Sequence, residues 1–247
     1  MDGMEVTIVQ TEREFDTALA WRVVGQMIRK ANSVIGLATG NTTVGTYRIV
    51  SDIYQRYPFD TSRVTVFGLD EIVMVPKELP GTCYNRLLEQ IVEPLHIPLE
   101  NFIMPPTEAD DYEYECALFE KRIKERGKVD LQILGIGIDG HVGMNLPGAP
   151  LEQQVWLTEL SGELQARLRR NNNFPESKQL AGITLGMKMI MQMDRLVLAA
   201  KGRQKAEIIN QAINGPITGD VPASLLQLHP NCEVLLDAEA AGLLKAV

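Results

Sequence analysis

The sequence contains few cysteines. Cys83, Cys116 and Cys232 are the only three in 247 residues, and no two of them form a C-x-x-C pair. A disulfide framework or a thiolate zinc site requires paired or clustered cysteines. The spacing therefore favours a reducing compartment, in which we expect the thiols to be inert.

Long apolar runs and a leader pattern are also missing. No stretch approaches the ~18 apolar residues that a membrane span requires. The first ten residues carry acids in place of the basic segment and apolar core of a secretory leader. We therefore expect a cytoplasmic protein without a membrane partner.

Clusters of positive charge are scarce. The chain has 24 Lys and Arg against 32 Asp and Glu, a formal net charge of −8, and its longest basic run is Arg169-Arg170. A nucleic-acid groove needs an extended basic surface, so we expect no nucleic-acid partner and a small molecule as the ligand. With 45% hydrophobic residues, the chain can bury a sizeable core as one domain over residues 1–247.

Short β-rich apolar runs alternate with helical patterns along the chain. The strand candidates are Val6–Val9, Val34–Leu37, Val64–Phe67, Leu131–Ile138, Leu196–Ala199 and Val234–Leu236. Alternation of this kind is typical of βαβ units. We therefore expect an α/β fold: a doubly wound, mostly parallel, Rossmann-like sheet with helices on both faces, in a single domain.

Helical spacing predicts what covers this sheet. Thr11 and Glu14 have the spacing of a capping box and precede an amphipathic stripe. Further helices are predicted at Val44–Gln55, Cys83–Val92, Asp111–Glu125 and Gln204–Ile213. Ligands of such sheets bind beyond the carboxyl ends of the strands, near a topological switch point, so the loops after the strands are the candidate sites.

The first candidate loop is Thr39-Gly40-Asn41-Thr42-Thr43, between a predicted strand and a predicted helix. Its hydroxyls, its glycine and the helix N-terminus could hold a phosphate. The alternative is a plain turn in which Thr42 or Thr43 caps the helix. No Gly-Lys-Ser/Thr follows, so the loop is not a P-loop.

The second candidate is the acidic pair Asp70-Glu71 after the strand candidate that ends at Phe67. A partly desolvated carboxylate there suits proton abstraction next to a carbonyl or imine. Adjacent side chains on extended backbone face different ways, so the two are not expected to share one proton. A solvated turn or a helix cap is the structural alternative.

The third candidate is the glycine-rich loop from Gly135 to Gly148. It satisfies G-x-G-x-x-G, but Pro147 and Pro150 follow too soon for the long helix of a dinucleotide site, so we reject that interpretation. What remains is a turn that presents Asp139 and His141, an acid beside a residue that titrates near neutrality. A histidine that only stabilises the loop is the alternative.

Two histidines and one lysine complete the set. His96 is predicted to lie in a surface connector and His229 to cap or pack, and no metal site can be assembled from the sequence. Lys205 stands at the start of a predicted helix, where the helix dipole disfavours a cation. That position favours anion binding over a plain solvated lysine.

Together these motifs resemble the glucosamine-6-phosphate deaminase/isomerase family, which shares a superfamily with 6-phosphogluconolactonase. The matching segments, in order, are Leu37-Ala-Thr-Gly-Asn-Thr, Leu69-Asp-Glu, Gly135-Ile-Gly-Ile-Asp-Gly-His, Asn145-Leu-Pro-Gly, Gly202-Arg-Gln-Lys-Ala and Ala223-Ser-Leu-Leu-Gln-Leu-His. The stretch from Asp70 to Cys83, with Gly182-Ile-Thr-Leu-Gly186, is most similar to the galactosamine-6-phosphate isomerase branch.

The resemblance implies a reaction on an amino-sugar 6-phosphate without a cofactor. It implies that His141, helped by Asp139, opens the sugar ring, and that Asp70 moves the C2 proton to C1 before ammonia is released. It implies that the phosphate is held by Thr39, Gly40, Asn41, Thr42 and Lys205. Whether Arg169, Arg170 or Lys178 also reaches the phosphate stays open, and a homo-oligomer is compatible with the sequence.

One position departs from the family pattern. The deaminases carry a glutamate five residues after the loop histidine, where this chain has Leu146. A leucine cannot orient an imidazole or raise its basicity, so a lactone hydrolase is the closest alternative function. A sugar-phosphate sensor without catalysis is the second alternative, although only about ten residues precede the first predicted helix and a DNA-binding module does not fit there.

Overall fold

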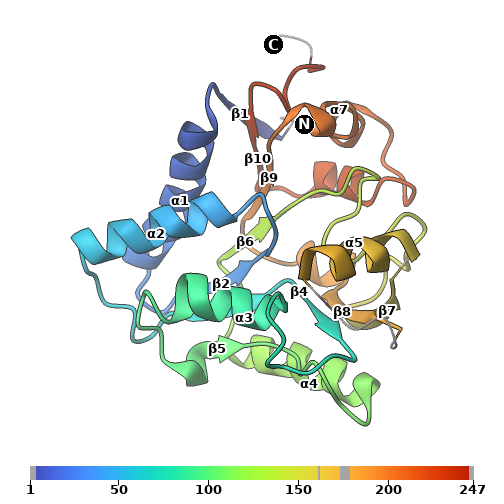
Figure 1. The fold of residues 1–247 in the computed structure, drawn as a ribbon. Coiled ribbons are helices and arrows are strands. Elements are labelled where there is room, and N and C mark those ends of the chain that lie inside the picture. Colours follow the sequence, from blue (N-terminus) through green and yellow to red (C-terminus); the bar gives the residue numbers. More distant parts are fainter. Residues whose placement is uncertain (1–3, 161, 173–178, 245–247) are drawn as a thin grey trace.

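The fold is built around a seven-stranded parallel sheet. The computed structural model describes residues 4–160, 162–172 and 179–244. Its large sheet has the order β1-β10-β9-β6-β2-β3-β5, with every pairing parallel (Figure 1). Its strands are β1 Glu5–Val9, β2 Val34–Leu37, β3 Thr65–Gly68, β5 Phe102–Ile103, β6 Leu131–Leu134, β9 Leu196–Ala200 and β10 Cys232–Asp237.

Helices cover both faces of this sheet. On strand β10, Leu235 belongs to one core cluster, while Val234 and Leu236 belong to the other. The first cluster includes side chains of α1 Glu12–Arg29, α2 Val44–Arg56 and α3 Cys83–Leu87, which continues as a π-helical turn at Leu88–Val92. The second includes α4 Tyr112–Glu125, α6 Met187–Ile190 and α7 Ala206–Asn214.

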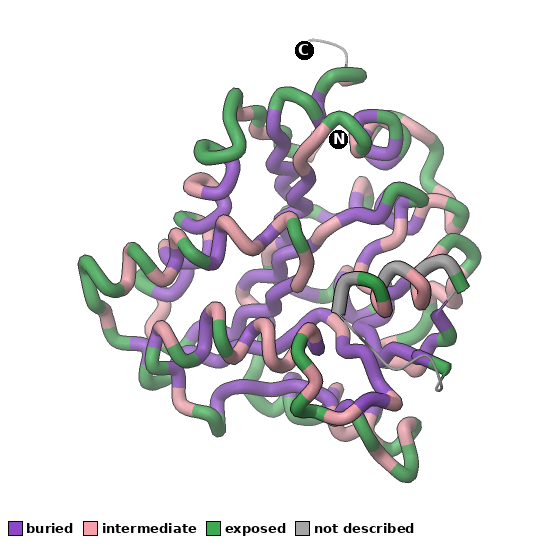
Figure 2. Tube along the Cα trace, in the orientation of Figure 1, coloured by how far each residue is buried: buried purple, intermediate pink, exposed green. Residues whose placement is uncertain are grey.

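The buried strands explain why the sequence predicted them well. A parallel sheet covered on both faces needs apolar residues at successive positions. The strands from β10 to β5 in the sheet order are buried along their length, and they are the buried segments between partly exposed helices in Figure 2, whereas the edge strand β1 is partly exposed. The predicted doubly wound α/β fold is confirmed, and each predicted strand coincides with an observed one. One boundary was wrong: β6 ends at Leu134, and the chain then turns through Gly135 and Gly140.

A second, antiparallel sheet of three strands was not predicted. Its order is β4-β8-β7, formed by β4 Asp70–Val73, β8 Ala181–Leu185 and β7 Val155–Glu159. Asp70 and Glu71 were expected in an open loop, whereas they begin β4. Helix α5, Gly162–Asn172, contributes Leu168 to a small apolar cluster that also contains Ile72 and Met144.

The first helix begins as its sequence predicts. The side chain of Thr11 accepts from the backbone N–H of Glu14, and the Glu14 carboxylate accepts from the backbone N–H of Thr11, at 3.1 Å in both cases.

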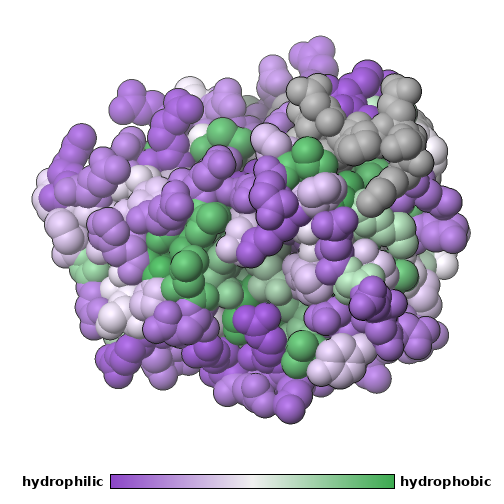
Figure 3. Space-filling view, turned by 60° about the horizontal axis from the view of Figure 1, so that its bottom comes forward, coloured by the Kyte–Doolittle hydropathy of each residue, from purple (hydrophilic) through white to green (hydrophobic). Residues whose placement is uncertain are grey.

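Figure 3 shows a surface on which hydrophobic residues gather near the middle, surrounded by hydrophilic ones. Among the described helices, none is long and apolar enough to cross a membrane.

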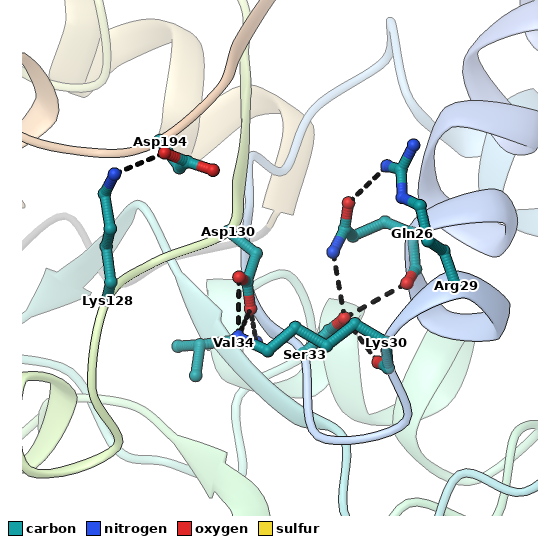
Figure 4. A network of polar contacts seen from close by, with 8 residues as sticks. All are labelled: Gln26, Arg29, Lys30, Ser33, Val34, Lys128, Asp130 and Asp194. Carbon is teal, nitrogen blue, oxygen red and sulfur yellow. Dashed lines mark hydrogen bonds and ion pairs between the residues drawn. The ribbon is translucent and has the colours of Figure 1, made fainter.

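A polar network ties the end of α1 to the start of the central strands (Figure 4). Asp130 accepts from the Lys30 ammonium at 2.7 and 2.8 Å and from the backbone N–H of Val34 at 2.9 Å. Its side chain is only 13% exposed. The nearby ion pair between Lys128 and Asp194 is solvent-exposed by comparison. Removal of the Asp130 side chain would leave a buried N–H group without its partner, whereas removal of the Asp194 side chain would leave an exposed lysine.

We expect Asp130→Ala to lower the free energy of unfolding by about 1–3 kcal/mol, because it leaves the buried Val34 N–H unpaired. Asp194→Ala is the matched control and should change it by about 0.5 kcal/mol or less, since exposed ion pairs contribute little. Urea unfolding followed by circular dichroism measures both. Equal losses in the two variants would contradict this account of the network.

Candidate active site

The predicted loops meet where two neighbouring strands lead the chain in opposite directions. Strands β2 and β6 are paired, and the chain continues from β2 towards β3 and from β6 towards β9. The carboxyl ends at such a switch point leave a crevice above the sheet. A cavity of about 590 Å³ lies there.

The cavity collects nearly all of the predicted site residues. Among its lining residues are Thr39, Gly40, Asn41, Thr42, Asp70, His141 and Lys205. Asp139 does not line it, but contacts His141. Residues from three loops and from the start of α7 thus line one cavity, at the carboxyl ends of the strands where the sequence analysis placed the candidate site.

The first loop leaves the start of helix α2 without a side-chain cap. Thr43 directly precedes the helix, but its hydroxyl donates back to the carbonyls of Ala38 and Gly40, at 3.4 and 3.2 Å. Gly40 has a φ of 138°, which favours glycine. The capping interpretation of this loop therefore finds no support, and the first N–H groups of α2 stand beside the cavity loop, where an anion is favoured.

Asp70 and Glu71 point to different surroundings, as expected from alternation along a strand. Glu71 is fully buried, and its carboxylate accepts from the backbone N–H groups of Cys83 at 2.8 Å and Tyr84 at 2.6 Å. It thereby fastens the start of helix α3 to strand β4. Burial raises the pKa of Glu71 to about 8, against the effect of these donors.

Asp70 faces the cavity instead. Burial raises the pKa of its carboxyl group to about 6, while a hydrogen bond from Cys83 opposes the shift. Near neutral pH such a carboxylate is mostly ionised, yet it is a stronger base than an ordinary aspartate. That combination suits removal of a carbon-bound proton.

His141 and Asp139 form a pair on the loop after β6. The Nδ1 atom of His141 lies 2.6 Å from Oδ1 of Asp139. Burial opposes ionisation of Asp139, but the charge and hydrogen bonds of His141 outweigh it and lower the pKa of this carboxyl group. An ionised Asp139 accepts the Nδ1 proton, which in the neutral ring leaves Nε2 as the basic nitrogen.

The pair depends on the glycine beside it. A Cβ atom on Gly137 would overlap the ring of His141 and lie 2.5 Å from Oδ1 of Asp139. The backbone N–H of Gly137 also donates to the carbonyl of His141 at 2.9 Å. Among the described residues no helix lies between this loop and α5, so the loop lacks the helix that a dinucleotide fingerprint opens.

Two cations line the cavity. Lys205 directly precedes α7, and its ammonium group donates to the carbonyl of Ile136 at 2.7 Å, on the loop after β6 that carries His141. Arg86 on α3 was missed by the sequence analysis; the only available signal was its position one turn after the predicted helix start at Cys83. Arg169 and Arg170 lie on α5 and are not lining residues, and Lys178 lies outside the described residues.

The remaining polar candidates are structural. His229 accepts from Asn231 N–H and contacts the Met193 carbonyl at 3.0 Å, as its predicted packing role requires. Asn145 is buried and donates to the carbonyls of Val142 and Leu185, both at 2.8 Å. In the described part of the chain, no group of three or more His, Cys, Asp or Glu could hold a metal ion.

Comparison with known proteins places the chain in a family. Residues 11–235 match the family described as glucosamine-6-phosphate isomerases/6-phosphogluconolactonase. A glucosamine-6-phosphate deaminase of Clostridium botulinum (strain Langeland) is 35% identical over 245 residues, 98% of this chain and 99% of that protein. The structure of a monomeric glucosamine-6-phosphate deaminase has a TM-score of 0.92 at 30% identity, covering 97% of this chain and 100% of the other.

The chain therefore belongs to the family of glucosamine-6-phosphate isomerases and 6-phosphogluconolactonases. The predicted family, and the prediction that the chain is an enzyme of this family, are confirmed. A 6-phosphogluconolactonase from Trypanosoma brucei, with a TM-score of 0.77 at 20% identity over 98% of this chain and 99% of the other, shares the fold.

We expect Gly137→Ala to separate His141 from Asp139 and to lower the free energy of unfolding by about 1–3 kcal/mol, because the added methyl group overlaps both side chains. Proton NMR should show loss of the downfield Nδ1–H signal of His141. Gly25→Ala is the control, since its Cβ would meet no atom within 4 Å. An unchanged Nδ1–H signal in Gly137→Ala would contradict the assignment.

Proposed function

We propose that this chain deaminates and isomerises an amino-sugar 6-phosphate to the ketose 6-phosphate and ammonia. The observation that carries the proposal is one cavity in which a carboxyl group of raised pKa, Asp70, faces the same space as the hydrogen-bonded His141. An aldose–ketose conversion needs two proton-transfer groups of this kind, one at the ring and one at carbon. The deaminase relatives, matched over nearly their whole length, support it.

The reaction divides between these groups. His141, oriented by Asp139, takes the proton of the C1 hydroxyl and returns one to the ring oxygen, which opens the ring. Asp70 then removes the proton from C2 of the open-chain form, while the C1 oxygen takes up a proton from the substrate's ammonium group. The protonated Asp70 next delivers the C2 proton to C1, which leaves an iminium at C2. Water adds to this iminium, and ammonia leaves with formation of the ketose carbonyl. Every step is a proton transfer or a hydrolysis, and none of them requires a cofactor.

The phosphate is assigned to the other group of lining residues. The uncapped start of α2 behind Thr39–Thr42 supplies N–H groups and hydroxyls, and Lys205 supplies a positive charge. Binding energy from a non-reacting phosphate can place C1 and C2 against the catalytic groups.

We expect Asp70→Asn to lower kcat by at least about a hundredfold, because the amide cannot accept the C2 proton. Phosphate-ligand binding should persist, since the ligand is held elsewhere in the cavity. In the unaltered enzyme kcat/KM should rise with pH through about pH 6 as Asp70 ionises. Ammonia release over a pH series measures the rate, and ligand-induced thermal stabilisation measures binding. Retained activity would remove Asp70 from the mechanism.

Lactone hydrolysis is the second candidate function, and Leu146 is the observation that favours it. This position follows Asn145 on the loop that carries His141, and its side chain is apolar, so it supplies no carboxylate to the imidazole. The carboxylate that contacts the ring is that of Asp139.

We expect Leu146→Glu to raise deaminase activity by a few-fold, because it restores the carboxylate that the deaminases of the family carry at this position, which would orient the imidazole of His141 and raise its basicity. Kinetics of ammonia release measures the change, with Leu146→Gln as a control that adds a polar side chain without the charge. An unchanged or lower rate in a folded variant would mean that the leucine does not limit the enzyme.

The proposed function is tested by substrate. Glucosamine 6-phosphate, galactosamine 6-phosphate and 6-phosphogluconolactone are incubated separately, and ammonia, ketose and acid are measured. Motif resemblance over Asp70–Cys83 favours the galactosamine epimer, whereas the names of the relatives favour glucosamine; the ratio of kcat/KM values decides between them. Lactone turnover without ammonia would overturn the proposal, and binding without turnover would indicate a sensor.

A further inference from the structure

One cysteine occupies a position in the cavity that the proposed reaction does not use. The Sγ atom of Cys83 lies 3.0 Å from the hydroxyl oxygen of Thr39 and 3.4 Å from Oδ1 of Asp70. Its residue is only 5% exposed, yet it lines the cavity. The thiol therefore joins the first candidate loop to the proposed base.

The position of this thiol is fixed from behind. Cys83 is the first residue of α3, and its backbone N–H donates to Oε1 of Glu71 at 2.8 Å. Thr82 caps the same helix by accepting from the N–H of Asn85 at 3.2 Å. The two adjacent carboxylates of β4 thus act on one residue from two sides: Glu71 holds its backbone, and Asp70 meets its side chain.

The surroundings keep the sulfur protonated. Burial raises the pKa of Cys83, and the neighbouring carboxylates of Glu71 and Asp70 add to the shift. The reactive form of a cysteine is the thiolate, so this environment disfavours a nucleophile. A protonated thiol can instead donate a hydrogen bond and accept another.

We propose that Cys83 is a positioning residue of this site. Its S–H group donates a hydrogen bond to the Asp70 carboxylate, and its sulfur accepts a hydrogen bond from the Thr39 hydroxyl. The thiol thereby holds Asp70, the proposed base, and the proposed phosphate loop at Thr39–Thr42 in one arrangement. The proposal rests on the proposed function, in which Asp70 moves the C2 proton. Of the three side chains joined here, Asp70, Thr39 and Cys83, the proposed reaction had left only Cys83 without a role.

The sign of the effect follows from the charges around Asp70. A hydrogen bond to the ionised form of a carboxyl group lowers its pKa, and Cys83 acts on Asp70 in this direction. The other titratable or charged groups that line the cavity are Arg86 on α3, His141 after β6 and Lys205 before α7, while Glu71 lies buried behind Asp70 and accepts from the backbone N–H of Cys83. Because Cys83→Ala removes the thiol and keeps both these groups and the backbone N–H that donates to Glu71, we expect its main effect on the titration of Asp70.

The test compares Cys83→Ala, Cys83→Ser and Cys116→Ala. Cys116 is a buried thiol on α4, away from the cavity, and serves as the matched control. In Cys83→Ala the acidic limb of the kcat/KM profile should move to higher pH by about half a unit or more, with kcat reduced more than KM at pH 6. Cys83→Ser should restore the limb, and Cys116→Ala should leave it unchanged.

A second readout does not depend on turnover. The infrared S–H stretching band of Cys83, assigned from the difference between the unaltered protein and Cys83→Ala, should shift as Asp70 titrates and should not do so in Asp70→Asn. A band that ignores pH in the unaltered protein overturns the proposal, as does an acidic limb that is the same in Cys83→Ala and Cys116→Ala. Absence of ammonia release from every amino sugar, with a pH-dependent band, would instead sink the proposed function alone.

Discussion

The pairing of strands β2 and β6 is the constraint on which the site depends. These strands are neighbours in the sheet but almost a hundred residues apart in sequence, with Ile35 opposite Leu131. Because parallel strands end at the same edge, their following loops must open side by side. The loop from Thr39 and the loop that carries His141 therefore face one cavity, and the strand pairing alone accounts for this. Chemistry that needs an anion holder and a proton shuttle close together can use this edge without further elements.

Strand β4 adds the third component through alternation. Its first two residues are both acids, and the pleat sends Asp70 to the cavity and Glu71 into the protein. Desolvation acts on both carboxyl groups, but with different results. Asp70 becomes a stronger base and still faces the cavity, whereas Glu71 accepts hydrogen bonds from the backbone N–H groups at the start of α3. Of these two neighbouring acids, one thus faces the cavity, where we propose that it moves a proton, and the other holds the scaffold, a division of roles that a shared-proton pair would not allow.

The central strands and the three loops could be predicted from the sequence because their signals are local. β2, β9 and β10 are short apolar runs, and polar or glycine-rich residues follow β2 and β6 directly. The antiparallel sheet could not be predicted in this way: β4 starts with two acids, β8 contains a glycine, and Asp70 pairs with Thr184, far along the chain. Cys83 and Arg86 could not be predicted for a related reason: α3 is held to β4 by hydrogen bonds from the backbone N–H groups of Cys83 and Tyr84 to the Glu71 side chain, a contact between segments that no local pattern marks.

A net charge of −8 disfavours polyanions, but it leaves room for a single phosphate. The charge describes the whole surface, whereas the Lys205 ammonium acts locally, where it is already directed at the carbonyl of Ile136. That carbonyl precedes His141 by five residues on the same loop, and Ala223 N–H secures the loop at Gly140 with a 2.9 Å hydrogen bond. Lys205, the proposed phosphate-binding lysine, and His141 are therefore fixed to one segment. Under the proposed function, a ligand that binds through its phosphate would meet catalytic groups whose positions are already set, and such preorganisation is the main route by which binding energy lowers a reaction barrier.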